Sequence, residues 1–574
     1  MIARVFVLIV VSITSALANT NNNEVSESLK ISGNNHRNHF VRGLGPHVRQ
    51  TWGEPWPEPQ RRTLYGENFM VVRMALFRFK VTNFTCDMID LALKRYYDIL
   101  LGAGAESQKL KMRLVVNQAE RVTTGYRGHL DVLEVNLLSS CEYLPHDNMD
   151  ESYKLKIDTP TRPNRGVLVA NSNWGILRGL ETFSQLVHHS RNHSAFRVKS
   201  TFVQDFPRFS FRSILLDTSR HFLSKEILLK NLDLMAMNKM NAFHWHLVDD
   251  QSFPFESKLY PELSGKGAYN PYTHVYSRQD VAEIIEYARL RGIRVIPEFD
   301  TPGHTQSWGP AVPDLLTKCY QNSTIAGRQP VPDGTFGPID PTQEKNYRFL
   351  KTFLGEVVDT FPDKYLHLGG DEVDFSCWKS NPDIGAFMRN ENMTRYESLE
   401  EYYMQKLVEI VASFPEKKVS IVWQEVIDNG VEIEKDSVLV NVWKGWHYQE
   451  ELGNVTRMGY RALLYSCWYL DMISWNNDWP GYYACDPQNF TGSAGQKELV
   501  VGGGAALWTE FVDETNALSR LWPRASAPAE RLWSSADVKD VEKAAPRLEE
   551  HRCRLLRRGY SVQPVNGPGF CEQV

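Results

Sequence analysis

Two adjacent acidic residues, Asp371 and Glu372, are the strongest candidates for catalysis in this chain. They follow a short apolar run and the pair Gly369-Gly370, where a strand is expected to end. Two neighbouring carboxylates repel each other, so one should keep its proton to higher pH and serve as a proton donor. Hydrolysis of a glycosidic bond usually needs such a donor and a second carboxyl group. The two glycines are expected to let a substrate approach the backbone closely.

Further polar and aromatic residues follow other short apolar runs in the same way. Each alone has an ordinary explanation, because an Asp after a strand usually caps the next helix and a buried Trp usually belongs to the core. Together they describe a sugar pocket, in which polar groups bind hydroxyls and rings stack on the sugar. The candidates are Arg220, Asp249, His304, Trp423, Trp443, Tyr469, Asp471, Trp508 and Glu510.

The elements that would position these residues repeat from about residue 206 onward. Eight β-branched or apolar runs are mostly followed by amphipathic stretches, such as 226–240 and 278–291. This alternation predicts a (β/α)8 TIM barrel over residues 206–574, with its active site at the carboxyl ends of the strands. An open doubly wound sheet would normally need a glycine-rich phosphate loop after its first strand, which we do not find. The runs are 213–216, 242–248, 294–299, 365–368, 419–423, 438–443, 461–465 and 500–508.

The sequence before the barrel divides into three parts. Residues 1–18 have a charged start, a short apolar run and an Ala-x-Ala end, which is typical of a signal peptide. The alternative, a membrane anchor, needs a longer apolar run. Residues 19–60 are polar and their start is expected to be disordered. Residues 61–205 are expected to form an α+β domain that packs against the barrel, with strands at 111–118, 131–138 and 153–157 and helices at 87–101 and 174–187.

The composition indicates a protein of the secretory pathway, either lysosomal or extracellular. The formal net charge of −5 gives no reason to expect a nucleic-acid partner. No later stretch is apolar enough to span a membrane. Eight cysteines, an even number, suggest disulfides in an exported chain. Asn-x-Ser/Thr sequons occur at Asn83, Asn192, Asn322, Asn392, Asn454 and Asn489.

Several of these segments resemble family 20 of the glycoside hydrolases, the β-N-acetylhexosaminidases. The resemblance covers nearly the whole chain after its polar start. It is strongest to animal lysosomal hexosaminidase subunits, of invertebrate and β-subunit type. The matching segments are 217–221 (DTSRH), 244–250 (HWHLVDD), 300–304 (DTPGH), 367–373 (HLGGDEV), 468–471 (WYLD) and 521–525 (LWPRA).

The resemblance implies retaining exo-hydrolysis of terminal β-linked N-acetylhexosamines, with the acetamido oxygen of the substrate as nucleophile. An oxazolinium ion is the expected intermediate. Glu372 is expected to be the general acid and then the general base. Asp371 is expected to orient the acetamido group, and Tyr469 to donate a hydrogen bond to its oxygen. Asp249 and His304 are expected to form a relay behind Glu372.

The remaining candidates are assigned by the same resemblance to substrate binding. The walls of the acetamido pocket are expected to consist of Trp423, Trp443 and Trp508. The sugar hydroxyls are expected to be bound by Arg220 and Glu510. The family implies no metal and no cofactor. His244 and His246 could resemble a metal pair, but their spacing suits a strand and we interpret them as structural.

Asp471 is expected to limit the range of substrates. Animal subunits of one type carry an Asp followed by an apolar residue at this position, as Asp471-Met472 does here. A carboxylate beside the 6-hydroxyl would repel an anionic sugar, which predicts a preference for neutral N-acetylglucosamine and N-acetylgalactosamine. Alternatively, Asp471 merely binds the 6-hydroxyl with little discrimination.

The resemblance also implies the pairing of the cysteines. Cys467 and Cys485 are extra relative to vertebrate members, and their joint presence suggests a disulfide beside Tyr469. The sequence by itself leaves the connectivity open. The three other implied pairs are Cys86–Cys141, Cys319–Cys377 and Cys553–Cys571.

Three other functions fit parts of the pattern. A sugar-binding protein on a decayed barrel would have lost a catalytic position, and none is lost here. A glycosidase with a protein nucleophile would need a second carboxylate about 5–5.5 Å from Glu372. A specialised role, such as chitin turnover or gamete recognition, would use the same chemistry. The family further implies a homodimer.

Overall fold

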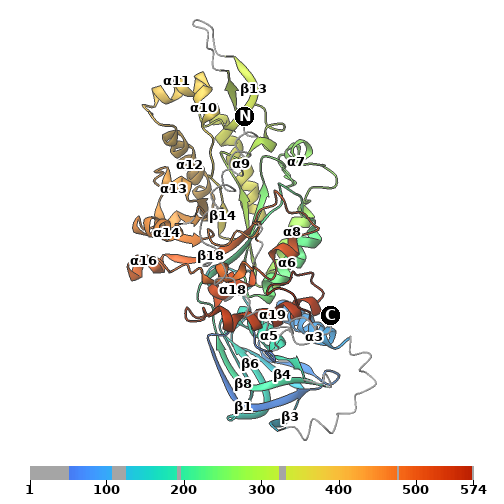
Figure 1. Ribbon diagram of the computed structural model, residues 1–574. Coiled ribbons are helices and arrows are strands. Elements are labelled where there is room, and N and C mark those ends of the chain that lie inside the picture. The colour runs from blue at the N-terminus through green and yellow to red at the C-terminus, as the bar shows by residue number, and fades with distance from the viewer. Residues whose placement is uncertain are drawn as a thin grey trace, which may run out of the picture.

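The computed structural model describes residues 51–105, 124–190, 195–321, 331–445, 447–472, 474 and 477–571. The expected signal peptide, most of the polar segment, the strand at 111–118 and the sequons Asn192 and Asn322 lie outside these residues. The described chain forms a closed barrel of parallel strands above a second, mixed sheet (Figure 1). This confirms the predicted fold class, a TIM barrel with a smaller α+β part.

The barrel consists of eight strands, each hydrogen-bonded to two parallel neighbours. The first three strands are buried along their whole length, because helices cover their outer face and side chains fill the interior. Every predicted run agrees with a strand to within two residues. The strands are β9(Phe211–Asp217), β10(Ala242–Val248), β11(Arg294–Phe299), β14(Tyr365–His367), β15(Val419–Trp423), β16(Val438–Val442), β17(Arg461–Leu464) and β18(Val500–Leu507).

Long helices follow the early strands, and shorter ones follow the later strands. Ser277 and Asp280 form a capping box at the start of one of them, α8. A hairpin, β12(Leu316–Tyr320) with β13(Pro332–Ile339), is inserted after β11 and extends from the barrel. The longer helices are α6(Lys225–Met237), α8(Arg278–Arg289), α9(Glu344–Thr360), α12(Tyr396–Ala412) and α14(Tyr448–Arg457), and the shorter ones include α10(Ser376–Ser380), α11(Pro382–Asn390), α13(Glu425–Asp428), α15(Trp479–Ala484), α16(Ala494–Glu498) and α18(Ser526–Trp533).

The second sheet contains more strands than we predicted, in the order β2-β4-β6-β5-β8-β1-β3, with β7 paired to β8. The helices α3(Asp87–Ala105) and α5(Asn173–Leu186) pack on each other and on one face of this sheet. In Figure 1 they lie between the sheet and the barrel. The strands are β1(Arg61–Val72), β2(Arg78–Asn83), β3(Tyr126–Leu130), β4(Val132–Leu137), β5(Tyr153–Thr159), β6(Arg162–Ala170), β7(His188–His189) and β8(Phe196–Asp205).

Buried ion pairs join the second sheet to the amino-terminal end of the barrel. Glu151 binds both Arg178 of α5 and Arg212 of β9 at 2.7 Å, and its side chain is 2 % exposed. Lys239 binds Asp205, the last residue of β8, at 2.7 Å. A buried charge that loses its partner costs about 3–5 kcal/mol, so these pairs lock the two parts together.

The described end of the polar segment is held by the last helix, α19(Val541–Arg557). Thr51 and Gly53 donate backbone N–H bonds to Glu550 of this helix. Trp56 is fully buried and donates to the Ser526 carbonyl. Residues 51–60 therefore belong to the folded body of the protein.

Four disulfides are present, and they are the four predicted pairs. Disulfides form and persist in oxidising compartments, which agrees with a secretory-pathway protein that is lysosomal or extracellular. Three of the sequon asparagines, Asn83, Asn392 and Asn489, are exposed, and Asn454 is half-buried. The bonds join Cys86 to Cys141, Cys319 to Cys377, Cys467 to Cys485 and Cys553 to Cys571.

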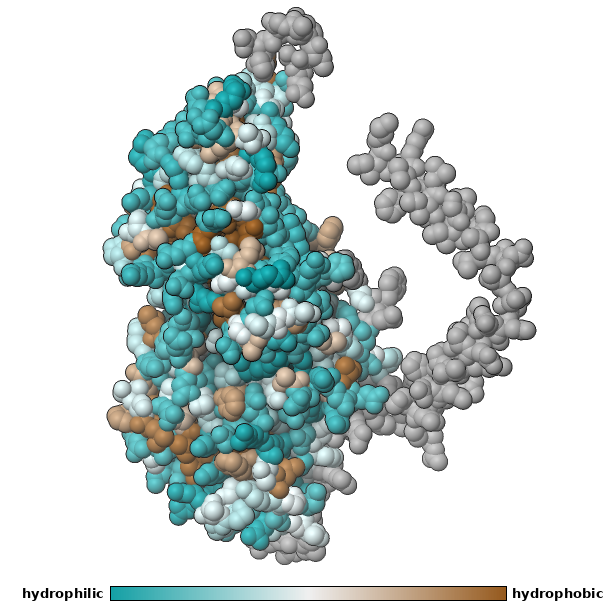
Figure 2. Space-filling view, turned by 90° about the vertical axis from the view of Figure 1, so that its left-hand side faces the viewer, coloured by the Kyte–Doolittle hydropathy of each residue, from teal (hydrophilic) through white to brown (hydrophobic). Residues whose placement is uncertain are grey.

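Among the described residues, no helix is both long and apolar enough to cross a bilayer. The face seen in Figure 2 is mostly hydrophilic, with apolar residues gathered in separate patches.

Candidate active site

The predicted relay residues meet at the carboxyl ends of β10 and β11. His304 Nδ1 lies 3.1 Å from Asp249 Oδ1, and Arg220 binds the other oxygen of Asp249 at 2.8 Å. Asp217, at the end of β9, also binds Arg220, at 3.2 Å. Burial lowers the pKa of His304, but the charges of Asp371 and Asp249 raise it to about 9. His304 is therefore a cation held between carboxylates.

The acid pair lies on the other side of His304. His304 Nε2 is 3.6 Å from Asp371 and 3.9 Å from Glu372, which is beyond hydrogen-bonding distance. The Glu372 side chain is 62 % exposed, whereas Asp371 is buried. His304 and Glu372 both have a positive φ, of 56° and 49°. Such conformations are costly for residues with a side chain and are concentrated at functional sites.

A fifth acid, Asp300, follows β11 directly and faces Asp371. Burial and the charge of Asp371 raise the pKa of Asp300 well above its ordinary value. Asp300 thus stays protonated and can donate a hydrogen bond to Asp371, while its Oδ1 accepts the Gly370 N–H at 2.9 Å. A Cβ on Gly369 would lie 1.5 Å from Asp300 Oδ1. The Asp300 side chain therefore requires a glycine at position 369, a reason that we did not predict.

The predicted aromatic residues form one connected cluster beside the acids. The Trp423 ring lies 6.3 Å from Trp443 and 6.1 Å from Trp508, and Trp443 stacks on Tyr469 at 6.1 Å. Burial and the charge of Asp371 raise the pKa of Tyr469, while a hydrogen bond to Trp508 opposes this. The Tyr469 hydroxyl therefore stays protonated as a donor. The Arg220 guanidinium lies 5.0 Å from the Trp508 ring centroid.

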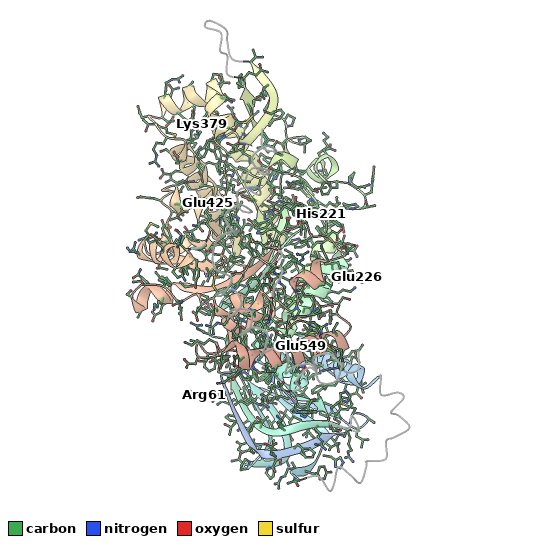
Figure 3. All side chains as sticks on the ribbon, viewed as in Figure 1. Arg61, His221, Glu226, Lys379, Glu425 and Glu549 are labelled. Atoms are coloured by element: carbon green, nitrogen blue, oxygen red, sulfur yellow. A yellow bond between two sulfur atoms is a disulfide. The ribbon has the colours of Figure 1, made fainter. Side chains whose placement is uncertain are left out.

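Glu425 fixes one wall of the aromatic cluster and was not among the predicted residues. Its carboxylate accepts a 2.7 Å hydrogen bond from Trp443 Nε1 and binds Lys444 at 2.8 Å. Gln424 accepts the backbone N–H groups of both Trp443 and Lys444. Glu425 and His221, the neighbour of Arg220, lie at the level of the barrel, far from Arg61 on the second sheet (Figure 3). The sequence signal for Glu425 was its position two residues after the end of β15.

Asp471 and Glu510 form an acidic edge next to Arg220. Burial and the nearby charge of Glu510 raise the pKa of Asp471 to about 6. Asp471 Oδ1 is buried and has no partner within the described chain. Glu510 is exposed. Burial lowers the pKa of Arg220, but the charges of Asp217, Asp249 and Glu510 together raise it. Asp250, the residue after Asp249, accepts the Gln306 backbone N–H at 2.9 Å.

The two histidines of β10 meet a buried acid that we did not predict. His244 Nε2 and His246 Nδ1 lie 2.8 Å and 2.7 Å from Glu298 Oε2. Glu298 lies opposite His246 in the ladder between β10 and β11. The other ring nitrogen of His246 lies 2.8 Å from Asp249 Oδ2. This acid therefore extends the relay into the interior of the barrel.

Comparison with known proteins agrees, along most of the chain, with the family resemblance noted in the sequence. Residues 209–536 match the description "Glycosyl hydrolase family 20, catalytic domain", and residues 55–186 match "beta-acetyl hexosaminidase like". The chain is 48 % identical to the Mus musculus β-hexosaminidase subunit β over 488 residues, which cover 85 % of this chain and 86 % of the relative. It is 45 % identical to the Mus musculus subunit α, over 90 % of this chain and 94 % of the relative.

A solved structure agrees with these matches. The X-ray structure of Flavobacterium johnsoniae chitobiase superposes with a TM-score of 0.73 and 28 % identity, over 88 % of this chain and 73 % of that chain. The acids, the relay and the aromatic cluster all lie within or directly beside the matched catalytic domain. The chain belongs to family 20 of the glycosyl hydrolases.

Proposed function

We propose that this chain is an exo-β-N-acetylhexosaminidase that removes terminal N-acetylglucosamine and N-acetylgalactosamine from glycoconjugates and chitooligosaccharides. The observation that carries the proposal is the cluster of Tyr469 and three tryptophans beside Asp371. An acetamido group is flat, with an apolar methyl group and polar N–H and C=O groups. It suits an enclosure of rings that holds one carboxylate and one hydroxyl donor. Relatives named β-hexosaminidase support the same substrate class.

In the first step, Glu372 gives its proton to the leaving oxygen while the acetamido oxygen attacks the anomeric carbon. The bond to the leaving group breaks and a bicyclic oxazolinium ion forms. Asp371 accepts the acetamido N–H and balances the positive charge that develops on the nitrogen. Tyr469 donates to the acetamido oxygen and the tryptophans hold the group in place, so the reaction gains from proximity.

In the second step, Glu372 acts as a base. It takes a proton from water, which attacks the anomeric carbon and opens the oxazolinium ring, so the β configuration is retained. The cationic His304 lies 3.9 Å from Glu372 and stabilises the carboxylate that exists between the two steps. Asp249 in turn stabilises the His304 cation.

The charged groups at the edge of the aromatic cluster bind the rest of the sugar. Arg220 and Glu510 bind the hydroxyls of the terminal sugar. Asp471 binds the 6-hydroxyl and, when ionised, opposes a 6-sulfate. The substrates are therefore neutral N-acetylhexosamines.

A comparison of nitrophenyl β-glycosides tests the proposal. Wild-type enzyme should hydrolyse the N-acetylglucosaminide and leave the glucoside, which lacks the acetamido group, nearly untouched. Glu372→Gln should lower kcat on the nitrophenyl N-acetylglucosaminide by about 10²–10⁴-fold, because the second step loses its general base even though nitrophenol itself needs little protonation. Comparable hydrolysis of the glucoside would instead support a glycosidase with a protein nucleophile.

We further propose that the protein is a homodimer, because relatives at 45–48 % identity are named as subunits. Light scattering after gel filtration should give twice the chain mass. A monomer mass at micromolar concentration would contradict this.

A further inference from the structure

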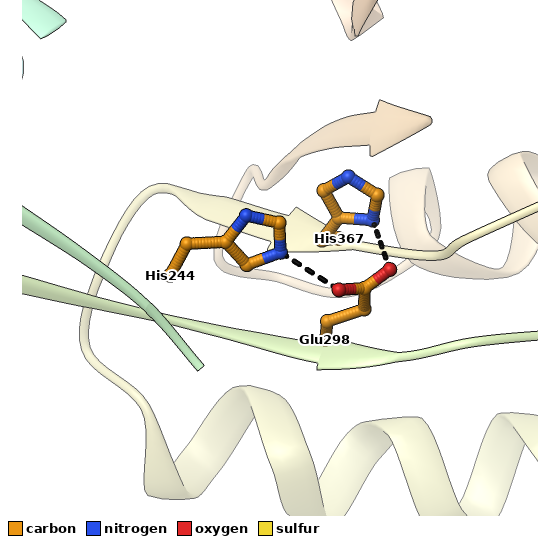
Figure 4. Close-up of side chains that lie close together, drawn as sticks. All are labelled: His244, Glu298 and His367. Carbon is orange, nitrogen blue, oxygen red and sulfur yellow. Dashed lines mark hydrogen bonds and ion pairs between the residues drawn. The ribbon is translucent and has the colours of Figure 1, made fainter. Parts of the chain in front are cut away.

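Glu298 is a buried acid at which several parts of the active site meet. It lies in β11 with 0 % exposure, inside the barrel and beneath the aromatic cluster. One carboxylate oxygen faces His244 and His246, as described above. The other accepts a 2.8 Å hydrogen bond from Trp423 Nε1 and lies 3.1 Å from His367 Nδ1 (Figure 4). Four ring nitrogens from three other strands thus lie around one side chain, and one of them, His367 Nδ1, also accepts the Gly369 backbone N–H at 3.1 Å.

The hydrogen-bond chemistry shows which of these groups are charged. Both ring nitrogens of His246 face carboxylates, Glu298 on one side and Asp249 on the other, so both must carry protons. Burial lowers the pKa of His246, but the charges of these two acids raise it to about 10. His244 faces an acid only at Nε2, while its Nδ1 faces the Tyr465 hydroxyl, and burial lowers its pKa to about 4.

These contacts form a chain of alternating charge that ends at the catalytic acids. Glu298 is negative, His246 positive, Asp249 negative and His304 positive, with contacts of 2.7, 2.8 and 3.1 Å between successive members. Each ion has at least one opposite charge beside it, so none is left uncompensated in the barrel interior. The chain then reaches Glu372 across 3.9 Å.

The other oxygen of Glu298 holds the aromatic cluster. The indole of Trp423 can rotate only about its two side-chain torsions, and the bond to Glu298 fixes the edge of its ring. Trp423 also contacts Trp443 and Trp508. A displacement of Trp423 would therefore change the shape of the whole acetamido enclosure.

We propose that Glu298 is a positioning residue for the reaction. One oxygen fixes Trp423 against the acetamido group, and the other keeps His246 cationic so that Asp249 and His304 stay aligned behind Glu372. The inference rests on the proposed function and adds a residue that couples nucleophile placement to proton donation.

Glu298→Gln is the direct test. The amide is isosteric but uncharged and has one acceptor oxygen, so it cannot accept from donors on both sides. Because a misplacement of about 1 Å can cost about 100-fold, kcat should fall by about that factor, with a smaller change in KM. The loss should be larger for a methyl or disaccharide leaving group than for nitrophenol. A poor leaving group needs the Glu372 proton, and nitrophenol scarcely does.

A matched control is available at the opposite end of the same strand. Asp363 forms a buried two-bond ion pair with Arg294, the first residue of β11. Asp363→Asn makes the same chemical change, from a carboxylate to an amide, and should lower the melting temperature. The ratio of its kcat to that of wild type should be the same for both leaving groups. The two variants together separate loss of stability from loss of positioning.

The proposal would be overturned if folded Glu298→Gln lost the same factor on both leaving groups, or lost no activity. If Glu298→Gln does not accumulate as folded protein, His246→Gln tests the branch toward Glu372 and leaves Trp423 bound. It should lose activity on the poor leaving group by at least about tenfold more than on nitrophenol. Equal losses would again exclude the relay. Wild-type hydrolysis in the same assay shows separately whether the proposed function holds.

Discussion

The charge state of Asp471 gives a prediction that can be worked out in some detail. Its pKa is raised to about 6 by burial and by the neighbouring Glu510. Below that pH the side chain is neutral, and above it the side chain is an anion beside the expected site of the 6-hydroxyl. The enzyme should therefore discriminate against 6-sulfo-N-acetylglucosamine more strongly as the pH rises through about 6.

The size of the effect follows from the population of the anion. With a pKa of about 6, roughly one tenth of Asp471 is ionised at about pH 5 and roughly nine tenths at about pH 7. A sulfate about 6 Å from the carboxylate, at an effective dielectric constant of about 20, is opposed by ~3 kcal/mol, or about 100-fold. The neutral fraction left at about pH 7 limits the observed change to about tenfold.

The assay compares kcat/KM for nitrophenyl N-acetylglucosaminide with that for its 6-sulfo derivative across this pH range. The ratio of sulfated to unsulfated rates should fall by about tenfold in wild type. In Asp471→Asn the ratio should stay constant and be at least as high as the wild-type value at low pH. A ratio that does not depend on pH in wild type, or a fall that persists in Asp471→Asn, would refute the role of Asp471.

Three further predictions concern catalysis and stability. Tyr469→Phe should lower kcat by about 10²–10³-fold, because it removes a donor to the acetamido oxygen, and a normal kcat would contradict that role. Replacing Cys467 and Cys485 together by Ser opens a loop with a sequence separation of 18, so the free energy of unfolding should fall by about 3 kcal/mol in urea titrations. An unchanged transition midpoint would show that this disulfide does not stabilise the fold. Glu151→Gln leaves two buried arginines uncompensated, so calorimetry should show a loss of about 3–5 kcal/mol, and a much smaller loss would mean that water or rearrangement replaces the ion pairs.

The barrel could be predicted from the sequence because its strands are buried on both faces. Such strands consist of nearly continuous β-branched and apolar residues, as in β15 and β16, and the amphipathic helices between them mark the boundaries. The second sheet was harder to predict. β1 and β2 expose charged residues such as Arg61, Arg78 and Lys80 and show only a weak apolar pattern, so neither was predicted.

The site residues that the sequence missed are polar groups whose role depends on a neighbouring strand. Glu298 lies in the middle of an apolar run, and only its register against His246 shows that two histidines face it. Asp300 falls within a recognised motif, but its proton depends on its contact with Asp371, which is distant in sequence. The alternation of His244 and His246 along one strand was the available signal, because it places both rings on the same face.

The most direct test of the central claim measures whether the acetamido group takes part in the reaction. Successive fluorine substitution of its methyl group withdraws electrons from the carbonyl oxygen and makes it a poorer nucleophile. If this oxygen attacks the anomeric carbon, kcat/KM for nitrophenyl substrates should fall steeply from acetyl to trifluoroacetyl, by at least about 100-fold, in the wild-type enzyme. Rates that stay within a few-fold across the series would contradict substrate assistance and require a nucleophile supplied by the protein.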